Sequence, residues 1–263
     1  MKRRDFIAAA GAAAATPMVS FAGVDPVSAP DGRQYIELQQ YHLLYGSKQG
    51  LVHDYLENAA IPAYNRLGIN PVGVFQVVYG QNAPSLYVLL PHSSLESVVT
   101  TSHKLLADEE YVEQGAAFVN ASMSDPAFVR MENTLLYAFE SMPGVAVPPQ
   151  KAAGKPRIFE MRTYESHSEK AAKNKLEMFN GGEVPIFRKT GLTPVFFGEA
   201  VVGSHMPHLT YMLVFDDMEA RDAAWKAFSA DPDWAKLAKD PRYQDNVSAI
   251  SDIILRPTGY SQL

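Results

Sequence analysis

Two segments of the chain place carboxylate, guanidinium and phenol groups at alternating positions. Residues 33–43 read RQYIELQQYHL and residues 157–164 read RIFEMRTY. Alternate residues of an extended strand share one face, and those faces carry Tyr35, Glu37, Gln39 and Tyr41 in the first segment and Ile158, Glu160, Arg162 and Tyr164 in the second. Carboxylates beside Arg and Tyr can bind a small polar ligand or serve as acid and base. They can also neutralise each other as structural groups, the commoner role when such groups are buried.

Histidine offers a second kind of chemistry. His205 and His208 flank a Met-Pro pair between two apolar segments, which predicts two imidazoles at one hairpin turn. A metal site normally adds a carboxylate or a third histidine at a motif spacing, and none follows here. The other five histidines are scattered along the chain, so no axial haem ligand stands out. We therefore predict no metal and no cofactor.

Several common chemistries are excluded by composition or motif. The chain has no Cys, which removes disulfides, thiolate nucleophiles and Cys-based metal centres. It contains no G-x-G-x-x-G, no P-loop and no G-x-S-x-G sequence. With a formal net charge of −6 and no basic run after the first few residues, it shows no nucleic-acid signature.

The two polar segments belong to a duplicated unit. IPAYNRLGINPVGVFQVVYG at 61–80 aligns without a gap with VPIFRKTGLTPVFFGEAVVG, which begins 123 positions later. The six identities are Pro62/Pro185, Gly68/Gly191, Pro71/Pro194, Val72/Val195, Val78/Val201 and Gly80/Gly203, where chance would give about one or two. The same offset aligns E-L-Q-Q-Y with E-M-R-T-Y, so the register indicates an internal repeat.

Each unit has the same predicted order of elements. A strand (33–43 or 157–164) precedes a helix (48–66 or 168–189), which we expect to end at a left-handed glycine, Gly68 or Gly191. Two strands, a second helix (94–106 or 218–229) and a last strand (133–140 or 246–255) complete a β-α-β-β-α-β, ferredoxin-like unit. The first unit also carries an insertion, LADEEYVEQGAAFVNASM, that predicts an extra helix.

These elements predict an α+β protein with two ferredoxin-like domains, residues 33–142 and 157–257. Between them, residues 143–156 are rich in Pro, Gly and Ala and read as a linker. The sheet of such a unit is covered by helices on one face and bare on the other, so the two bare faces should pack together as a barrel within one chain. We expect Ile36, Leu38, Phe159 and Met161 to face the helices and the polar faces described above to line the barrel interior.

The second unit carries a distinctive set of residues. They are E-x-R-x-Y on its first strand, Arg221 on the helix after an apolar strand, and a D-P-x-W turn ending at Trp234. This set resembles the NIPSNAP domain. The first unit is similar but diverged, with Gln39 in place of Arg162 and Val98 in place of Arg221. Together the resemblance covers about residues 33–257.

The resemblance implies a fold more than an activity. NIPSNAP proteins group with the dimeric α+β barrels, alongside EthD-like proteins and antibiotic-biosynthesis monooxygenases, and that agrees with the tandem barrel. The family has no general reaction, and fold alone does not give function. Arg221 and Trp225 lie four residues apart on one helix, so we expect a stacked or cation–π pair there. We interpret that pair, with Trp234, as packing of the last helix.

The N-terminus predicts export. MKRRDFIAAAGAAAATPMVSFA has a twin arginine, a short Ala-rich apolar stretch and small residues before Ala22, which resembles a Tat signal peptide at 1–22. The apolar stretch is too short to span a bilayer. We therefore expect a periplasmic or otherwise exported protein with no integral membrane segment after signal removal.

Three functions remain open from the sequence. The first, which we favour, is a non-catalytic protein that binds a small ligand in its barrel or a protein partner on its outer face. The second is a cofactor-independent enzyme, similar to an oxygenase or isomerase, that acts on a small hydrophobic or phenolic compound. The third is an assembly protein with no pocket. Both a monomer and a homodimer agree with a barrel completed within one chain.

Overall fold

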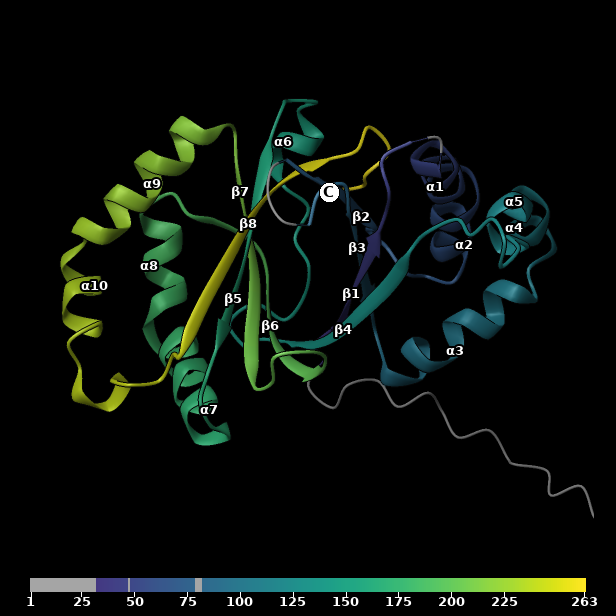
Figure 1. Ribbon diagram of the computed structural model, residues 1–263. Helices are drawn as coiled ribbons and strands as arrows, with labels where there is room; N and C mark the ends of the chain where they lie inside the picture. The colour runs from purple at the N-terminus through teal and green to yellow at the C-terminus, as the bar shows by residue number, and fades with distance from the viewer. Residues whose placement is uncertain (1–31, 47, 79–81) are drawn as a thin grey trace, which may run out of the picture.

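The fold is a single closed barrel of eight antiparallel strands with helices on two outer flanks (Figure 1). The computed structural model describes residues 32–46, 48–78 and 82–263, so the expected export signal at 1–22 lies outside the described residues. No helix in the described ranges is long and apolar enough to cross a membrane.

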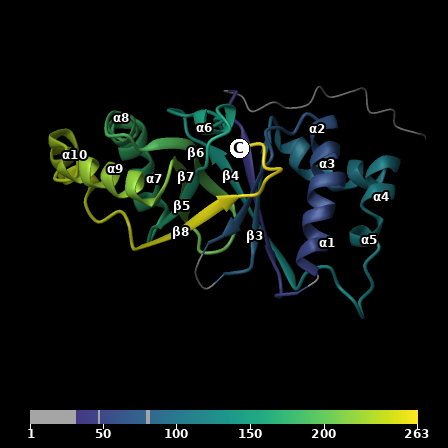
Figure 2. The same ribbon diagram turned by 90° about the horizontal axis from the view of Figure 1, so that it is seen from above.

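The first unit contributes four strands and five α-helices to the described structure. In chain order they are β1 (Tyr35–His42), α1 (Lys48–Tyr55), the π-helical turn η1 (Leu56–Ala60), α2 (Ile61–Arg66), β2 (Gly73–Val77), β3 (Leu86–His92), α3 (Leu95–Leu106), α4 (Glu109–Gln114), α5 (Ala116–Val119) and β4 (Arg130–Ala138). The predicted insertion therefore forms two short helices, α4 and α5, which pack on α1, η1 and α2 (Figure 2).

The second unit repeats this order after the linker, where a short helix α6 (Pro149–Ala152) forms. Its elements are β5 (Ile158–Glu165), α7 (Glu169–Met178), the π-helical turn η2 (Phe179–Glu183), α8 (Val184–Lys189), β6 (Thr193–Val202), β7 (His208–Phe215), α9 (Met218–Ala230), α10 (Pro232–Leu237), the 3-10 turn η3 (Pro241–Tyr243) and β8 (Ala249–Pro257). The predicted β-α-β-β-α-β order is confirmed in both units.

Hydrogen-bonded seams join the two units into the barrel. The strand order is β1-β3-β2-β8-β5-β7-β6-β4, in which β2 pairs with β8 and β4 pairs with β6 across the units. This order repeats after four strands, so the pseudo-twofold axis that relates the units runs along the barrel axis. Each mouth of the barrel is consequently lined by equivalent positions of both units.

The described residues form three apolar clusters. One lies inside the barrel and contains side chains from both units, among them Phe75, Phe159 and Phe196, all fully buried. The other two lie between the barrel wall and the helices of each unit, around Tyr64 in the first and Phe187 in the second. Both faces of the wall are therefore buried over much of their area.

The prediction of which strand face points into the barrel is wrong. Ile36, Leu38, Phe159 and Met161 belong to the cluster inside the barrel, whereas Tyr41 and Tyr164 belong to the clusters beneath the helices. Alternation separates the two faces of a strand but does not say which face is inside. The assumption that polar groups line the interior failed because those groups find partners on the outer face. Helix α9 supplies them to Glu160, and the neighbouring strands β3 and β4 supply them to Glu37.

The C-terminal residues close one end of the barrel. Leu263 is fully buried in the interior cluster, and Arg157 Nη2 donates a hydrogen bond to the Leu263 carbonyl oxygen. Lys151 of α6 donates to the Ser261 carbonyl oxygen at 2.6 Å. Residues after 257 therefore plug this mouth, and any opening must lie at the other end.

Candidate functional site

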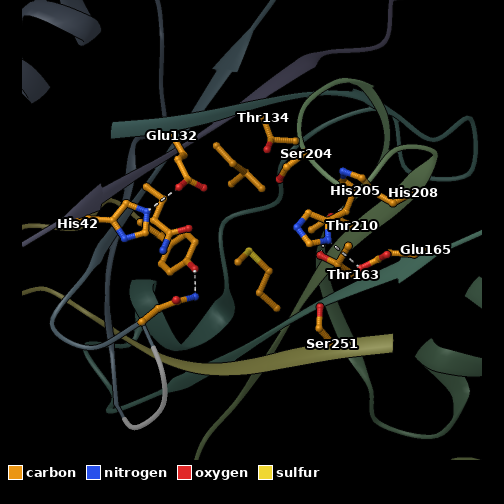
Figure 3. A pocket seen from close by; sticks show the side chains of 15 residues that line it. His42, Glu132, Thr134, Thr163, Glu165, Ser204, His205, His208, Thr210 and Ser251 are labelled. Atoms are coloured by element: carbon orange, nitrogen blue, oxygen red, sulfur yellow. Dashed lines mark hydrogen bonds and ion pairs between the residues drawn. The ribbon is translucent and has the colours of Figure 1, made fainter. Parts of the chain in front are cut away.

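A cavity of about 510 Å³ occupies the opposite mouth of the barrel. Its lining comes from both units: the ends of β1, β3 and β4 on one side, those of β5, β7 and β8 on the other, and the β2–β3 and β6–β7 connections (Figure 3). The lining residues are Leu38, Gln40, His42, Asn82, Tyr87, Glu132, Thr134, Met161, Thr163, Glu165, Ser204, His205, His208, Thr210 and Ser251. Cavities that hold small molecules have volumes of about 300–1,000 Å³.

The two units supply different chemistry at equivalent positions of this mouth. Strand and turn positions 123 apart pair Gln40 with Thr163, His42 with Glu165, Asn82 with His205 and Tyr87 with Thr210. A symmetric barrel would present each group twice, once from each side. Divergence of the repeat has made the cavity asymmetric, so its opposite walls can recognise different groups of one ligand.

Two His–Glu pairs face each other across the cavity. His42 Nε2 lies 3.2 Å from Glu132 Oε1 on the wall of the first unit. His205 Nδ1 lies 3.3 Å from Glu165 Oε1 on the wall of the second unit. Figure 3 shows these pairs on opposite sides of the cavity. All four side chains retain some exposure, so a ligand can reach them.

His208 is the buried histidine of this mouth. Its Nδ1 lies 3.3 Å from Thr210 Oγ1, which in turn lies 2.9 Å from Thr163 Oγ1. Burial lowers the pKa of His208, because the charged imidazolium loses solvation. The imidazole is therefore neutral near pH 7 and able to accept a proton.

The inner part of the cavity is less polar. Leu38 and Met161, which belong to the interior cluster, lie with Tyr87 among the lining residues. Gln40 Nε2 is buried, and no hydrogen-bond partner exists for it among the described residues. A ligand in this mouth would meet an apolar base and a polar rim, the usual composition of a small-molecule site.

The lining histidines and glutamates do not form a metal centre as they stand. Within the described ranges, no group of three or more His, Cys, Asp or Glu side chains is arranged to hold a metal ion. The His205–His208 pair considered from the sequence does line one site. It lies there with Glu165, on the side of the cavity opposite the His42–Glu132 pair (Figure 3).

The polar residues predicted in the second unit form a closed network between strand and helix. Glu160, fully buried, accepts hydrogen bonds from Arg162 Nη1 at 2.7 Å and from Trp225 Nε1 at 2.7 Å. Arg221 on α9 donates to both of its carboxylate oxygens, at 2.9 and 2.8 Å. Burial alone would raise the pKa of Glu160, but the hydrogen bonds from Arg221, Trp225 and Arg162 outweigh it and hold that pKa below its ordinary value.

The expected pairing of Arg221 with Trp225 is corrected in one respect. Both side chains bind Glu160, and the guanidinium over the Trp225 ring is that of Arg162, 4.8 Å from its centroid. Trp234 packs against Phe228, with ring centroids 4.5 Å apart. These family-pattern residues hold α9 and α10 against the barrel wall, and none of them lines the cavity.

The first unit has an equivalent network without arginine. Glu37 binds His92 Nε2 at 2.9 Å, accepts a hydrogen bond from Gln39 Nε2 at 2.9 Å and another from Asn133 Nδ2. Tyr41 donates to Gln39 Oε1 at 3.1 Å. Burial opposes ionisation, but these hydrogen bonds hold the pKa of Glu37 below its ordinary value.

None of the seven strand residues predicted as ligand-binding candidates lines the mouth cavity. Tyr35 stacks beside Tyr137 with centroids 4.8 Å apart, and Tyr164 accepts a hydrogen bond from Tyr211 at 2.9 Å. The cavity residues lie on the alternate positions of the same strands. Their signal in the sequence was the change from apolar to polar along that face, from Leu38 to Gln40 and His42, and from Met161 to Thr163 and Glu165.

Fold and site together define a tandem-repeat α+β barrel that is plugged at one end and carries a small-molecule-sized cavity at the other. The NIPSNAP family model matches residues 36–143 and again residues 159–262. The chain therefore belongs to the NIPSNAP family and contains two copies of its domain. No curated protein matches the sequence significantly.

Two of the solved structures similar to this chain share its fold at low sequence identity. A protein from Lactobacillus acidophilus, named as a candidate monooxygenase, is 8% identical with a TM-score of 0.57, over 86% of this chain and 94% of that one. A second, similarly named, from Fusobacterium nucleatum is 6% identical with a TM-score of 0.54, over 86% of this chain and 93% of that one. A NIPSNAP-like domain protein from Burkholderia xenovorans is 19% identical with a TM-score of 0.37, over 40% of this chain and 88% of that one. At such identities the first two show a shared fold alone.

Proposed function

We propose that the protein binds a small molecule in the mouth cavity of its barrel. The main support is the cavity itself. It has a volume of about 510 Å³, and ionisable groups of both units line it above an apolar base. The polar networks beneath the helices have their carboxylates fully partnered, and they do not compete for this role. A pocket also argues against an assembly protein that has none.

Filling the cavity with a large side chain tests this proposal. Ser251 on β8 is an exposed lining residue, so Ser251→Trp can place an indole in the mouth without disturbing the interior cluster. We expect ligand-observed NMR with a fragment library to detect binders to the natural protein that Ser251→Trp loses. The control is Ser93→Trp, an exposed position before α3 that does not line the cavity. Binders that survive Ser251→Trp would contradict the proposal.

A second candidate function is proton abstraction from a bound compound, as in a cofactor-independent oxygenase or isomerase. One observation favours it: His208 is buried at the mouth with its pKa lowered, so a neutral base is present near pH 7. The two candidate monooxygenases with the same barrel agree with this reading. Solvent exchange of an acidic C–H proton in any bound fragment, followed by NMR and lost in His208→Gln, is the test.

Export is a further proposal, and it is supported by the N-terminal sequence only. Arg3 and Arg4 precede the short apolar stretch of a twin-arginine signal. We expect the full chain to accumulate outside the cytoplasm with its first 22 or so residues removed. Replacing the pair by Lys-Lys should retain it in the cytoplasm at full length, as cell fractionation and intact-mass measurement would show.

A further inference from the structure

We propose that the ligand of the mouth cavity is an aliphatic diamine, held with one ammonium group at each of the two opposed carboxylates, Glu132 and Glu165. This inference rests on the proposed function, since it names the class of molecule that the same cavity takes. It follows from the charges of the lining, their placement and the apolar surface between them.

The lining is rich in hydrogen-bond acceptors and carboxylates but has no basic side chain of high pKa. Its ionisable residues are Glu132, Glu165, Tyr87 and three histidines, and none of the described lining residues is Lys or Arg. Its acidic groups are the two carboxylates. A dicarboxylate or phosphate would therefore meet repulsion, whereas ammonium groups would be attracted. The net charge of the chain, −6, adds a field of the same sign.

The placement of the carboxylates favours a ligand that has a cationic group at each end. Glu132 belongs to the wall of the first unit and Glu165 to the wall of the second, on opposite sides of the cavity (Figure 3). The lining also includes Leu38, Met161 and the ring of Tyr87. A short methylene chain can cover these apolar groups, and an aromatic face also attracts a nearby ammonium. Burial raises the pKa of Tyr87, so its phenol remains neutral.

The paired histidines give binding a pH dependence of definite sign. His42 and His205 each lie beside one of the carboxylates, and His208 lies within the same cavity. Arg130, an exposed residue, is the other charge beside Glu132, with Nη1 3.9 Å from Oε1. Histidine side chains as a class gain positive charge on acidification, and any positive charge beside either carboxylate opposes an ammonium group. Diamine affinity should therefore fall on acidification, and the affinity of an anion should rise.

Calorimetric titration of the full chain tests the inference with four matched probes: 1,4-diaminobutane, butylamine, butane-1,4-diol and succinate. At pH 7.5 and low salt, we expect the diamine to bind about fivefold more tightly than butylamine, since it makes two half-exposed ion pairs rather than one. The diol and succinate should bind more weakly still. When the titration is repeated at pH 5.5, the affinity for the diamine should be at least threefold lower.

Two isosteric variants locate the binding. Glu132→Gln and Glu165→Gln should each lower diamine affinity by about fivefold and leave butane-1,4-diol unchanged. Glu109→Gln, an exposed position on α4 outside the cavity, should change nothing. Diaminoalkanes with two to six carbons would show the preferred span.

The outcomes distinguish a failure of the diamine inference from a failure of the proposal that the mouth cavity binds a small molecule. Tighter binding of succinate or of the diol, or diamine affinity that rises at pH 5.5, overturns the diamine assignment. If such a compound is lost in Ser251→Trp, the mouth remains the binding site and only the ligand class is wrong. Should no probe bind and the fragment screen also find no binder in the mouth, both the diamine inference and the proposed function fail.

Discussion

Glu160 shows what one residue does in this fold. Its carboxylate lies fully buried on β5 and accepts hydrogen bonds from Arg162 on its own strand and from Arg221 and Trp225 on α9. A buried charge is tolerated only when such partners replace its hydration. The Glu-x-Arg-x-Tyr pattern and the Arg and Trp of the helix are thus parts of one interaction, which ties the helix layer to the barrel wall.

Removing this charge should destabilise the protein strongly. Glu160→Gln leaves two guanidinium groups without their carboxylate, and the loss of one partner from a buried ion pair costs about 3–5 kcal/mol. We expect a decrease near the lower value in the free energy of unfolding by urea, since both arginines keep some exposure. Glu219→Gln, at an exposed position of α9, should change it by less than about 0.5 kcal/mol.

Acid should destabilise the fold through the two strand glutamates. Their folded-state pKa values lie below the ordinary 4.5, because hydrogen bonds to the carboxylates outweigh burial. The stability that such groups contribute is present above pH 4.5 and is lost as pH falls through the lower folded values. Burial raises the pKa of Glu183, which therefore acts in the opposite direction.

Urea unfolding at pH 7, 5, 4 and 3 measures this dependence. We expect the free energy of unfolding to fall mainly below pH 4.5, and Glu37→Gln, which removes one titrating group, to flatten the fall. A variant curve parallel to that of the natural protein would show that Glu37 does not contribute.

At the scale of elements, the first helix of each unit contains the same irregularity. Each contains a π-helical turn at the equivalent position, η1 at Leu56–Ala60 and η2 at Phe179–Glu183. Both helices then end at a glycine in the left-handed region, Gly68 with φ 77° and Gly191 with φ 87°. The second π turn also carries Glu183, whose carboxylate accepts a hydrogen bond from Lys175 Nζ at 2.8 Å in a buried pair, where the first unit has Ala60 and Val52.

Alanine substitutions of Gly50, inside α1, and of Gly68, in the turn after α2, should change the free energy of unfolding in opposite directions. Gly68→Ala forces an L residue into φ 77°, with no atom near the new Cβ, and should lower the free energy of unfolding by about 1 kcal/mol. Gly50→Ala in α1 meets no atom either but has ordinary helical backbone, and it should raise stability by up to about 1 kcal/mol. Urea unfolding of both variants is the measurement, and equal signs would contradict this explanation.

On the scale of the whole molecule, the barrel has two unequal ends. The C-terminal residues plug one mouth with Leu263, and the other mouth holds the cavity. Because each unit forms one half of the barrel and the pseudo-twofold axis runs along it, each end draws on both repeats. The asymmetry of the ends thus comes from the tail, and the asymmetry within the cavity comes from divergence of the repeats.

The plug should matter for stability. Leu263→Ala removes a fully buried side chain from the interior cluster and should cost about 2–5 kcal/mol. Leu106→Ala, where the leucine is 61% exposed at the end of α3, is the matched control and should have little effect. Thermal unfolding of the two variants makes the comparison, and similar melting temperatures would show that Leu263 is not part of the core.

Separated units should reassemble. Expressed alone, residues 33–148 or 149–263 would expose the inner sheet face with Phe75 or with Phe159 and Phe196, and large exposed apolar faces favour association. We expect the two fragments, when mixed, to form a one-to-one complex by native mass spectrometry. Fragments that remain monomeric and folded in isolation would contradict the shared core.

The repeat, the order of elements and the glycine helix ends could be derived from the sequence, because each depends on local pattern. Gly68 and Gly191 stand 123 positions apart and end equivalent helices, as their spacing indicated. The family resemblance depended on the same local residues, such as the Glu-x-Arg-x-Tyr strand and Trp234, and the match to both units confirms it.

Only the tertiary structure decided which face of each strand is inside. Glu37 and Glu160 alternate with Leu38 and Met161 whichever way the strand is turned, and burial on both faces removes the usual contrast with solvent. Partners distant in sequence resolved the choice: His92 for Glu37 and Arg221 for Glu160 lie on the helix side. The cavity could not be predicted from the sequence either. Its residues come together only when the barrel closes, which brings His42 and Glu165 to one mouth although they lie 123 residues apart in the sequence.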